Sequence, residues 1–143
     1  MTLNNGMGDV DEFEKNIHLQ TYDPLIQEHL EYKCAEKITA VDHADGQSYW
    51  VLTQFVDTFY AFRVDNNGVN LTPVTSTVAP SISVDGYRRN GIGYLKSSPD
   101  GGKLAISHSQ NSTSEGINSG NGSAWIYDFD KETGVVSNPL QLD

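Results

Sequence analysis

The sequence predicts an all-β fold built from two similar four-stranded units. Three observations support this prediction: short runs rich in Val, Ile, Tyr, Phe and Trp, turn signals such as Asp-Gly and Asn-Gly between them, and an internal repeat. β-Branched and aromatic residues fit the pleated surface of a strand, and glycine supplies the positive φ of tight turns. A chain of 143 residues has the length of one domain, so no second independent domain is expected.

Eight of these runs are predicted to be strands, because each is short, rich in apolar residues and bounded by turn signals. They are residues 38–43, 48–54, 58–65, 72–76, 93–97, 103–107, 124–130 and 137–142. One short helix is predicted before them, since Asp23 followed by Pro24 is typical of a helix start. Apolar residues then recur at helical intervals: Leu25, Ile26, Leu30 and Cys34.

Two stretches of the chain repeat the same landmarks in the same order. HADGQSYWV at 43–51 aligns with SPDGGKLAI at 98–106, and FYAFRVD at 59–65 aligns with AWIYDFD at 124–130. Both copies then reach a turn glycine, followed by a proline five residues later. The offset grows from 55 residues at the Asp-Gly turns to 66 at the turn glycines, so the second copy has a longer hairpin. Its extra residues fall in the Ser-, Asn- and Gly-rich stretch 109–123, which is predicted to be a mobile loop.

A repeat of 55 to 66 residues with four short strands is typical of a β-propeller blade, a four-stranded antiparallel sheet that packs on its neighbours. The sequence therefore predicts two consecutive blades of an incomplete ring, at 36–90 and 91–143. Residues 1–35 are predicted to hold a helical linker and, at 15–19, the end strand of a preceding blade. The reason is that KNIHL at 15–19 resembles NPLQL at 138–142.

Charge and composition argue against several classes of function. The chain has 9 Lys and Arg against 19 Asp and Glu, a net charge of −10, which repels nucleic-acid phosphates and anionic membrane surfaces. We find no signal-peptide pattern at the N-terminus and no apolar run long enough to span a bilayer. The single cysteine, Cys34, excludes an internal disulfide and is expected to be a buried thiol.

Six motifs occur along the chain in an order that resembles a known family. They are GDV at 8–10, EKNI at 14–17, EKITAVDH at 36–43, DGQSYWV at 45–51, GYLKSSPDG at 93–101, and DFD at 128–130 with TG at 133–134 and SNP at 137–139. In these motifs the chain resembles the WD-repeat-like β-propeller region of large Bacteroidetes surface proteins, which end in a type B sorting domain read by the type IX secretion system. The resemblance implies a segment of an extracellular or cell-surface propeller and no shared catalytic residues.

The sequence contains no recognisable catalytic constellation. Ser98 lies in a Ser-Pro-Asp-Gly turn signal and lacks the Gly-x-Ser-x-Gly elbow of a serine nucleophile. The four histidines have no close metal-ligand spacing. Asp128, Asp130 and Glu132 alternate like calcium ligands, but the next glycine is misplaced for an EF-hand loop, so a hairpin turn is favoured over calcium. The chain is predicted not to be an enzyme and to need no cofactor.

Six residues are weak candidates for contact with a ligand: Trp50, Trp125, Arg88, Arg89, His43 and His108. The tryptophans could stack on a sugar or a peptide, although core packing is the default for strand aromatics. The arginine pair could clamp a carboxylate, although a solvated loop charge is the simpler interpretation. The two histidines lie near strand ends, where propellers often place side chains that contact ligands.

The predicted function is a non-catalytic binding or scaffold segment of a secreted or surface-exposed propeller. A lectin-like carbohydrate-binding module and a fragment of a secreted propeller hydrolase are the alternatives. Two blades cannot close a ring, and their outer faces would expose apolar surface to water. The expected partners are therefore further blades of the same protein, or copies of this chain in a ring of three or four, with a glycan or a protein as ligand.

Overall fold

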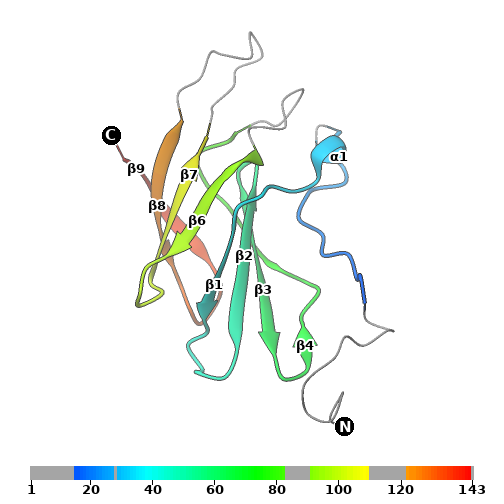
Figure 1. Ribbon diagram of the computed structural model, residues 1–143, viewed down its shortest axis with the longest axis vertical. Helices are drawn as coiled ribbons and strands as arrows, with labels where there is room; N and C mark the ends of the chain where they lie inside the picture. The colour runs from blue at the N-terminus through cyan, green and yellow to red at the C-terminus, as the bar shows by residue number, and fades with distance from the viewer. Residues whose placement is uncertain (1–14, 28, 83–90, 110–121, 143) are drawn as a thin grey trace.

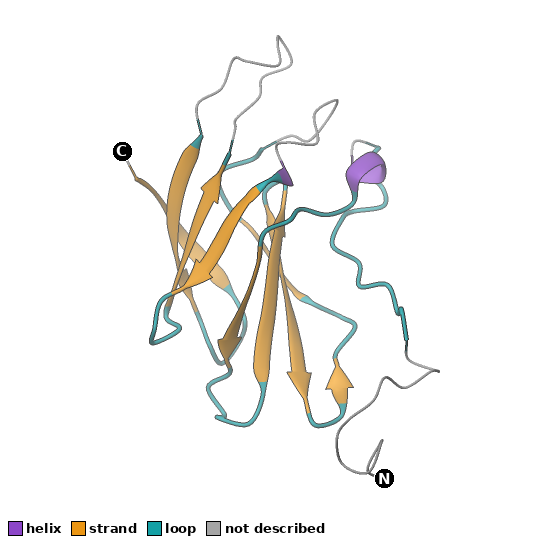
Figure 2. Ribbon diagram, viewed as in Figure 1, coloured by secondary structure: helices purple, strands orange, loops and turns teal. Residues whose placement is uncertain are grey.

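The computed structural model describes residues 15–27, 29–82, 91–109 and 122–142 of the chain. Two antiparallel sheets make up most of this part, and one short helix, α1 (His29–Tyr32), precedes them (Figure 2). The prediction of a mostly β fold with two four-stranded antiparallel units is confirmed. The structure contains no closed ring of blades within these residues.

The first sheet is four strands wide. β1 (Ile38–Asp42), β2 (Tyr49–Phe55) and β3 (Thr58–Asp65) follow one another as antiparallel hairpins. β4 (Gly68–Val69) and β5 (Val74–Thr77) pair with successive parts of the remaining edge of β3 and together fill the fourth position. The pairing with β4 is the only part of this sheet that the sequence does not predict.

The second sheet has the simple order β6, β7, β8, β9. Its strands are β6 (Gly93–Ser97), β7 (Lys103–His108), β8 (Ser123–Phe129) and β9 (Val136–Leu142). Each predicted strand is present with ends that shift by no more than two residues. The hairpin loop predicted at 109–123 joins β7 to β8, and most of it lies outside the described residues.

The two sheets pack on each other and share one core, with β1 and β6 side by side (Figure 1). The rings of Phe59 and Tyr127 meet edge to face across this interface with their centroids 4.9 Å apart. Full burial of each large apolar side chain stabilises the fold by about 1.5–3 kcal/mol. The buried members of this core are Val41, Trp50, Leu52, Phe59, Ala61, Leu95, Leu104, Ile106, Tyr127, Phe129 and Val136.

Both Asp-Gly turns of the repeat form as predicted. Gly46 and Gly101 have φ angles of 66° and 75°, which a side chain would disfavour. The carboxylates of Asp45 and Asp100 each accept a hydrogen bond from the backbone N–H group two residues further on. These bonds satisfy turn backbone groups that no sheet partner reaches.

Residues 15–27 and 29–35, here called the N-terminal segment, cover the face of the first sheet that points away from the second sheet (Figure 1). Phe55, Tyr60 and Phe62 are buried on this face, and Leu19 and Tyr32 of the segment pack against them. Residues 15–19, predicted as the end strand of a preceding blade, belong to neither sheet in this structure.

The N-terminal helix is shorter than predicted. The apolar periodicity from Leu25 to Cys34 does not form a buried stripe, because Leu25 is 92 % exposed and the Cys34 thiol is also exposed. The prediction of a buried thiol is therefore wrong. His29 is buried instead: its Nδ1 accepts a hydrogen bond from Asp23 N at 3.2 Å, and its ring packs edge-on against Phe55. Within the described residues, no helix is both long and apolar enough to cross a membrane.

Candidate functional site

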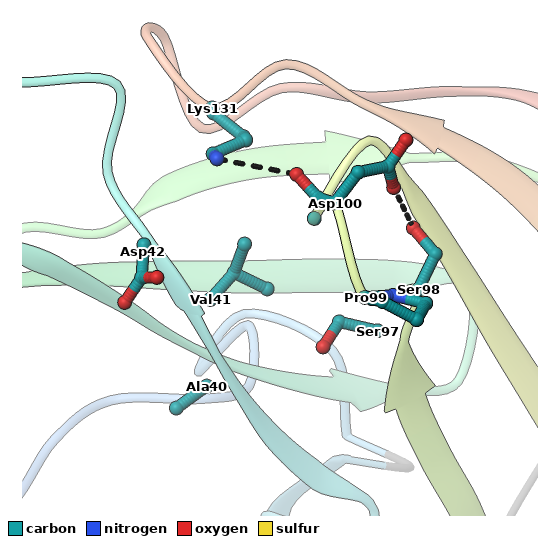
Figure 3. Close-up of a pocket in the computed structure, with 9 residues that line it drawn as sticks. Ala40, Val41, Asp42, Ser97, Ser98, Pro99, Asp100 and Lys131 are labelled. Atoms are coloured by element: carbon teal, nitrogen blue, oxygen red, sulfur yellow. Dashed lines mark hydrogen bonds between the residues drawn. The ribbon is translucent and has the colours of Figure 1, made fainter. Parts of the chain in front are cut away.

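A small polar pocket lies where β1 and β6 reach their turns (Figure 3). Its volume is about 130 Å³, enough for a few water molecules. Lys131 Nζ donates to the carbonyl oxygen of Asp100 at 3.2 Å, and the Ser98 hydroxyl donates to the Asp100 carboxylate at 2.5 Å. The bond from Ser98, together with one from the Gly102 N–H group, lowers the pKa of Asp100. The polar groups of the pocket form most of their hydrogen bonds with one another, so these bonds stabilise the turns.

Two of the predicted ligand residues, His43 and Trp50, lie at this same end of the fold. The His43 ring stacks on the Trp50 indole with 5.3 Å between centroids, and the indole N–H donates to Lys131 O at 2.8 Å. Trp50 is only 4 % exposed. Its indole therefore closes the core between the sheets and offers no face on which a sugar could stack.

A buried pair of basic side chains lies at the opposite end of the interface. Lys37 Nζ and His108 Nδ1 are 3.2 Å apart, and both residues are buried. Burial lowers the pKa of Lys37 to about 8; burial and the neighbouring Lys37 charge lower that of His108 to about 3. His108 Nε2 has no hydrogen-bond partner in the described part of the chain. A Cβ atom on Gly93 would lie 2.1 Å from Ser107 O and 3.1 Å from Lys37 Cδ, so glycine allows the close backbone approach and also leaves room for the lysine chain.

Trp125, a further predicted ligand residue, belongs to neither of these two groups. Trp125 is half-buried on β8, packs against the shared core and donates its indole N–H to Ser123 Oγ at 3.1 Å. Trp50 lies on the second strand of its sheet and Trp125 on the third, so they are not equivalent positions. Arg88 and Arg89 lie outside the described residues.

The predicted hairpin turn after β8 is present. The Asp130 carboxylate accepts hydrogen bonds from the N–H groups of Glu132 and Thr133. Hydrogen bonding by the Thr133 side chain, and then by these two N–H groups, lowers the pKa of Asp130. Asp128 is engaged elsewhere, by Lys103 and by Asn138. The described ranges contain no group of three or more His, Cys, Asp or Glu side chains placed to hold a metal ion.

The outward face of the second sheet exposes several large apolar side chains. Tyr94 is 74 % exposed and Leu140 is 60 % exposed. The register places Leu140 opposite Ile126 and Leu142 opposite Ala124 on this side. We call this surface, defined by Tyr94, Ile126, Leu140 and Leu142, the open face. Exposed apolar side chains gathered on one sheet face are typical of a binding interface.

Side chains at equivalent repeat positions point in the same direction, from the first sheet toward the second and from the second sheet away from the first. Ala61 pairs with Val74 in the first sheet, and Ile126 pairs with Leu140 at the matching repeat positions in the second. Ala61 and Val74 face the shared core, whereas Ile126 and Leu140 belong to the open face. The sheets are therefore stacked front to back.

The other faces of the two sheets show the same front-to-back relation. Phe62 aligns with Tyr127 in the repeat. Phe62 lies under the N-terminal segment, on the side away from the second sheet, and Tyr127 faces the shared core. The N-terminal segment thus occupies, on the first sheet, the position that the first sheet occupies on the second.

Comparisons with known proteins add no further constraint, since no family model, curated protein or solved structure matches this chain.

Proposed function

We propose that this chain is a two-blade segment of a β-propeller that works by binding and assembly rather than by catalysis. The observation that carries the proposal is the front-to-back stacking of the sheets. In a sandwich related by a two-fold axis, equivalent residues of both sheets would point into the same core. Here equivalent residues of both sheets point in the same direction, and the first strands of the two sheets, β1 and β6, are adjacent. Successive blades are arranged in this way around the axis of a propeller.

The open face is the surface that would receive a partner. Its equivalents on the first sheet, such as Ala61 and Val74, are covered by the second sheet. By the same relation, Leu140 and Ile126 would be covered by a further blade, which would present an apolar face like that of Leu104 and Tyr127. The partner we propose is therefore another blade of the same repeat.

The N-terminal segment bears on how copies of the chain could assemble. A ring of three or four copies needs the outer face of each first sheet, and this segment covers that face. The segment leaves an apolar crevice of about 340 Å³ beside Leu19, Val51 and Phe62, so it covers the face less completely than a sheet would. We therefore favour a further blade over a ring of copies, and place the parent protein at the cell surface from the motif resemblance alone.

No specific observation favours the two alternative functions. The lectin-like hypothesis depends on exposed tryptophans at equivalent positions, and Trp50 is buried in the core. The hydrolase hypothesis depends on a cluster of catalytic side chains at one rim. In the polar pocket beside the turns of β1 and β6, the Ser98 hydroxyl is bonded to the turn carboxylate of Asp100, and no His is among the described lining residues.

The test is the association state of the purified chain. A sheet face that lacks its partner tends to associate with another copy, so light scattering should show a mass that rises with concentration. Leu140→Lys on the open face should hold the chain at monomer mass. Leu71→Lys is the matched control, because Leu71 is 52 % exposed but lies in a loop of the first sheet. If the folded chain without substitutions stays monomeric at every concentration, the assignment of the open face as a docking surface is refuted.

A further inference from the structure

A second cavity lies between the N-terminal segment and the hairpin end of the first sheet. Its volume is about 450 Å³. Asp23 contributes to one wall, and Asp57, Thr58 and Tyr60 contribute to the other from the β2–β3 turn and the start of β3. Thr77, at the end of β5, lies beside Thr58 with 3.1 Å between hydroxyl oxygens. In Figure 1, α1 lies beside this end of the sheet. We call this cavity the N-terminal cleft.

Tyr60 brings an unused polar group to the cleft. The residue is only 7 % exposed, and its hydroxyl has no hydrogen-bond partner within the described ranges. Burial raises the pKa of Tyr60, and the charges of Asp23 and Asp57 raise it further. The phenol therefore stays protonated and lies within electrostatic reach of both carboxylates. The Tyr60 hydroxyl therefore borders the cleft with its hydrogen-bonding capacity free for an occupant.

Both carboxylates keep bonding capacity for a ligand. Asp23 Oδ1 accepts from Leu25 N at 2.9 Å, and Asp57 Oδ1 accepts from the Thr58 hydroxyl at 3.0 Å. Neither carboxylate forms an ion pair with another described residue, and no Lys or Arg is among the described residues that line the cleft. Two carboxylates without an ion-pair partner among the described residues, beside a tyrosine hydroxyl and threonine hydroxyls, are complementary to a cation.

The donor set favours an organic cation over a metal ion. The described part of the chain has no cluster of three or more His, Cys, Asp or Glu side chains that could hold a metal. The cleft is also far larger than a coordination sphere. A flexible ligand with an apolar stem and a charged end would place its stem beside Ile26, which is exposed at the cleft, and its hydrogen-bond donors against Asp23 and Asp57.

We propose that the N-terminal cleft binds an organic cation that carries a primary ammonium or guanidinium group, either as a free amine or as a basic side chain of a peptide. Asp23 and Asp57 accept charge-assisted hydrogen bonds from the cationic group, and the Tyr60 hydroxyl supplies a further oxygen acceptor. This inference is independent of the blade assignment, because the cleft involves only the first sheet and the N-terminal segment.

The experiment is a titration of the full chain followed by nuclear magnetic resonance. Agmatine represents a free amine with a guanidinium group, and acetyl-arginine amide represents a peptide side chain. Binding of both is expected, weakening as salt increases, because exposed charge pairs are screened. Butanediol and maltose, the neutral probes, are expected not to bind. Tighter binding of one cationic probe identifies the source of the cation.

Three variants and a control locate the site. Asp57→Asn and Tyr60→Phe should each weaken agmatine binding, the first by about tenfold, which corresponds to about 1.4 kcal/mol. Asp23→Asn should do the same while keeping the amide oxygen that accepts from Leu25. Asp65→Asn is the matched control, since Asp65 Oδ1 also accepts a turn N–H group but lies outside the cleft. Absence of agmatine binding, equal binding of maltose, or unchanged affinity in all three variants would overturn the proposal.

Discussion

Gly134 is required both for its backbone angle and for the space beside its Cα atom. Its φ is 78°, a region that side chains disfavour, and an added Cβ would lie 2.8 Å from Cη2 of Trp50. Gly46 has a similar φ of 66°, but a Cβ there would meet nothing within 4 Å. The two glycines therefore separate the cost of backbone strain from the cost of steric overlap.

Alanine at these two positions should have different effects. Gly46→Ala should lower the free energy of unfolding by about 1–2 kcal/mol, the cost of a left-handed backbone. Gly134→Ala should lower it further, by an additional amount of about 1–3 kcal/mol, because Trp50 is fixed by its bond to Lys131 and cannot move freely. Urea unfolding of both variants measures the difference. Equal losses would show that the Trp50 ring gives way at no cost.

His108 makes the stability of the fold depend on pH. Burial keeps its pKa in the folded chain near 3, below the ordinary value of 6.5, so the unfolded chain binds more protons between these two values. Stability therefore falls as the pH is lowered through this window. Lys37, the adjacent cation, adds to the cost of protonating His108.

One substitution tests whether His108 causes this pH dependence of stability. His108→Gln removes the titrating ring but keeps an oxygen that can accept a hydrogen bond from Lys37. The parent chain should lose up to about 1.4 kcal/mol of unfolding free energy per pH unit below 6.5, and the variant should lose less. Urea unfolding at neutral and mildly acidic pH measures both slopes. Parallel slopes would mean that other groups cause the pH dependence.

The individual site residues were the hardest to predict. Trp50 and His43 have the residue types of a ligand site, yet they stack on each other and close the core. Whether a strand aromatic points into an interface depends on which face the neighbouring sheet covers, and one strand does not encode that. Lys37 carries no sequence signal, because its burial results from β6 and β7 packing over the start of β1.

At the scale of the element, the strands could be predicted because their limits are local. Asp-Gly turns are held by the carboxylate of the turn residue itself, as at Asp45 and Asp100, so the turn is encoded where it forms. The N-terminal helix is a different case. Its extent depends on how the segment packs on Phe55 and Phe62, and the periodicity of Leu25 and its neighbours gives no information about that face.

β4 illustrates the same limit on a smaller scale. Gly68 and Val69 are too few to produce an alternating pattern, and they pair only because the turn after β3 brings them back to its edge. The N-terminal cleft is likewise invisible in the sequence, since Asp23 and Asp57 become neighbours of Tyr60 only when the N-terminal segment folds onto the sheet. Local patterns therefore predicted the strands, and long-range packing determined the candidate binding sites.

At the scale of the whole molecule, the internal repeat predicted two equivalent sheets, and the structure adds how they are stacked. Residues that are equivalent in sequence are not equally buried, because the second sheet covers the Val74 side of the first sheet, whereas no described strand covers the open face of the second. Val74 packs against the shared core, and Leu140, its repeat equivalent, is exposed on the open face. The same side chain position is thus a core position in one sheet and a surface position in the other.

Lysine substitution at these two positions tests the stacking directly. Val74→Lys should lower the free energy of unfolding by about 2–4 kcal/mol, because it forces an unpaired charge into the core between the sheets. Leu140→Lys should change it by no more than about 0.5 kcal/mol in the isolated chain, since the open face is solvated. Thermal and urea unfolding of the two variants, each in dilute solution to suppress association, provide the comparison. If Leu140→Lys were as damaging as Val74→Lys, the open face would already be covered in the folded chain, and the docking surface that we propose would not exist.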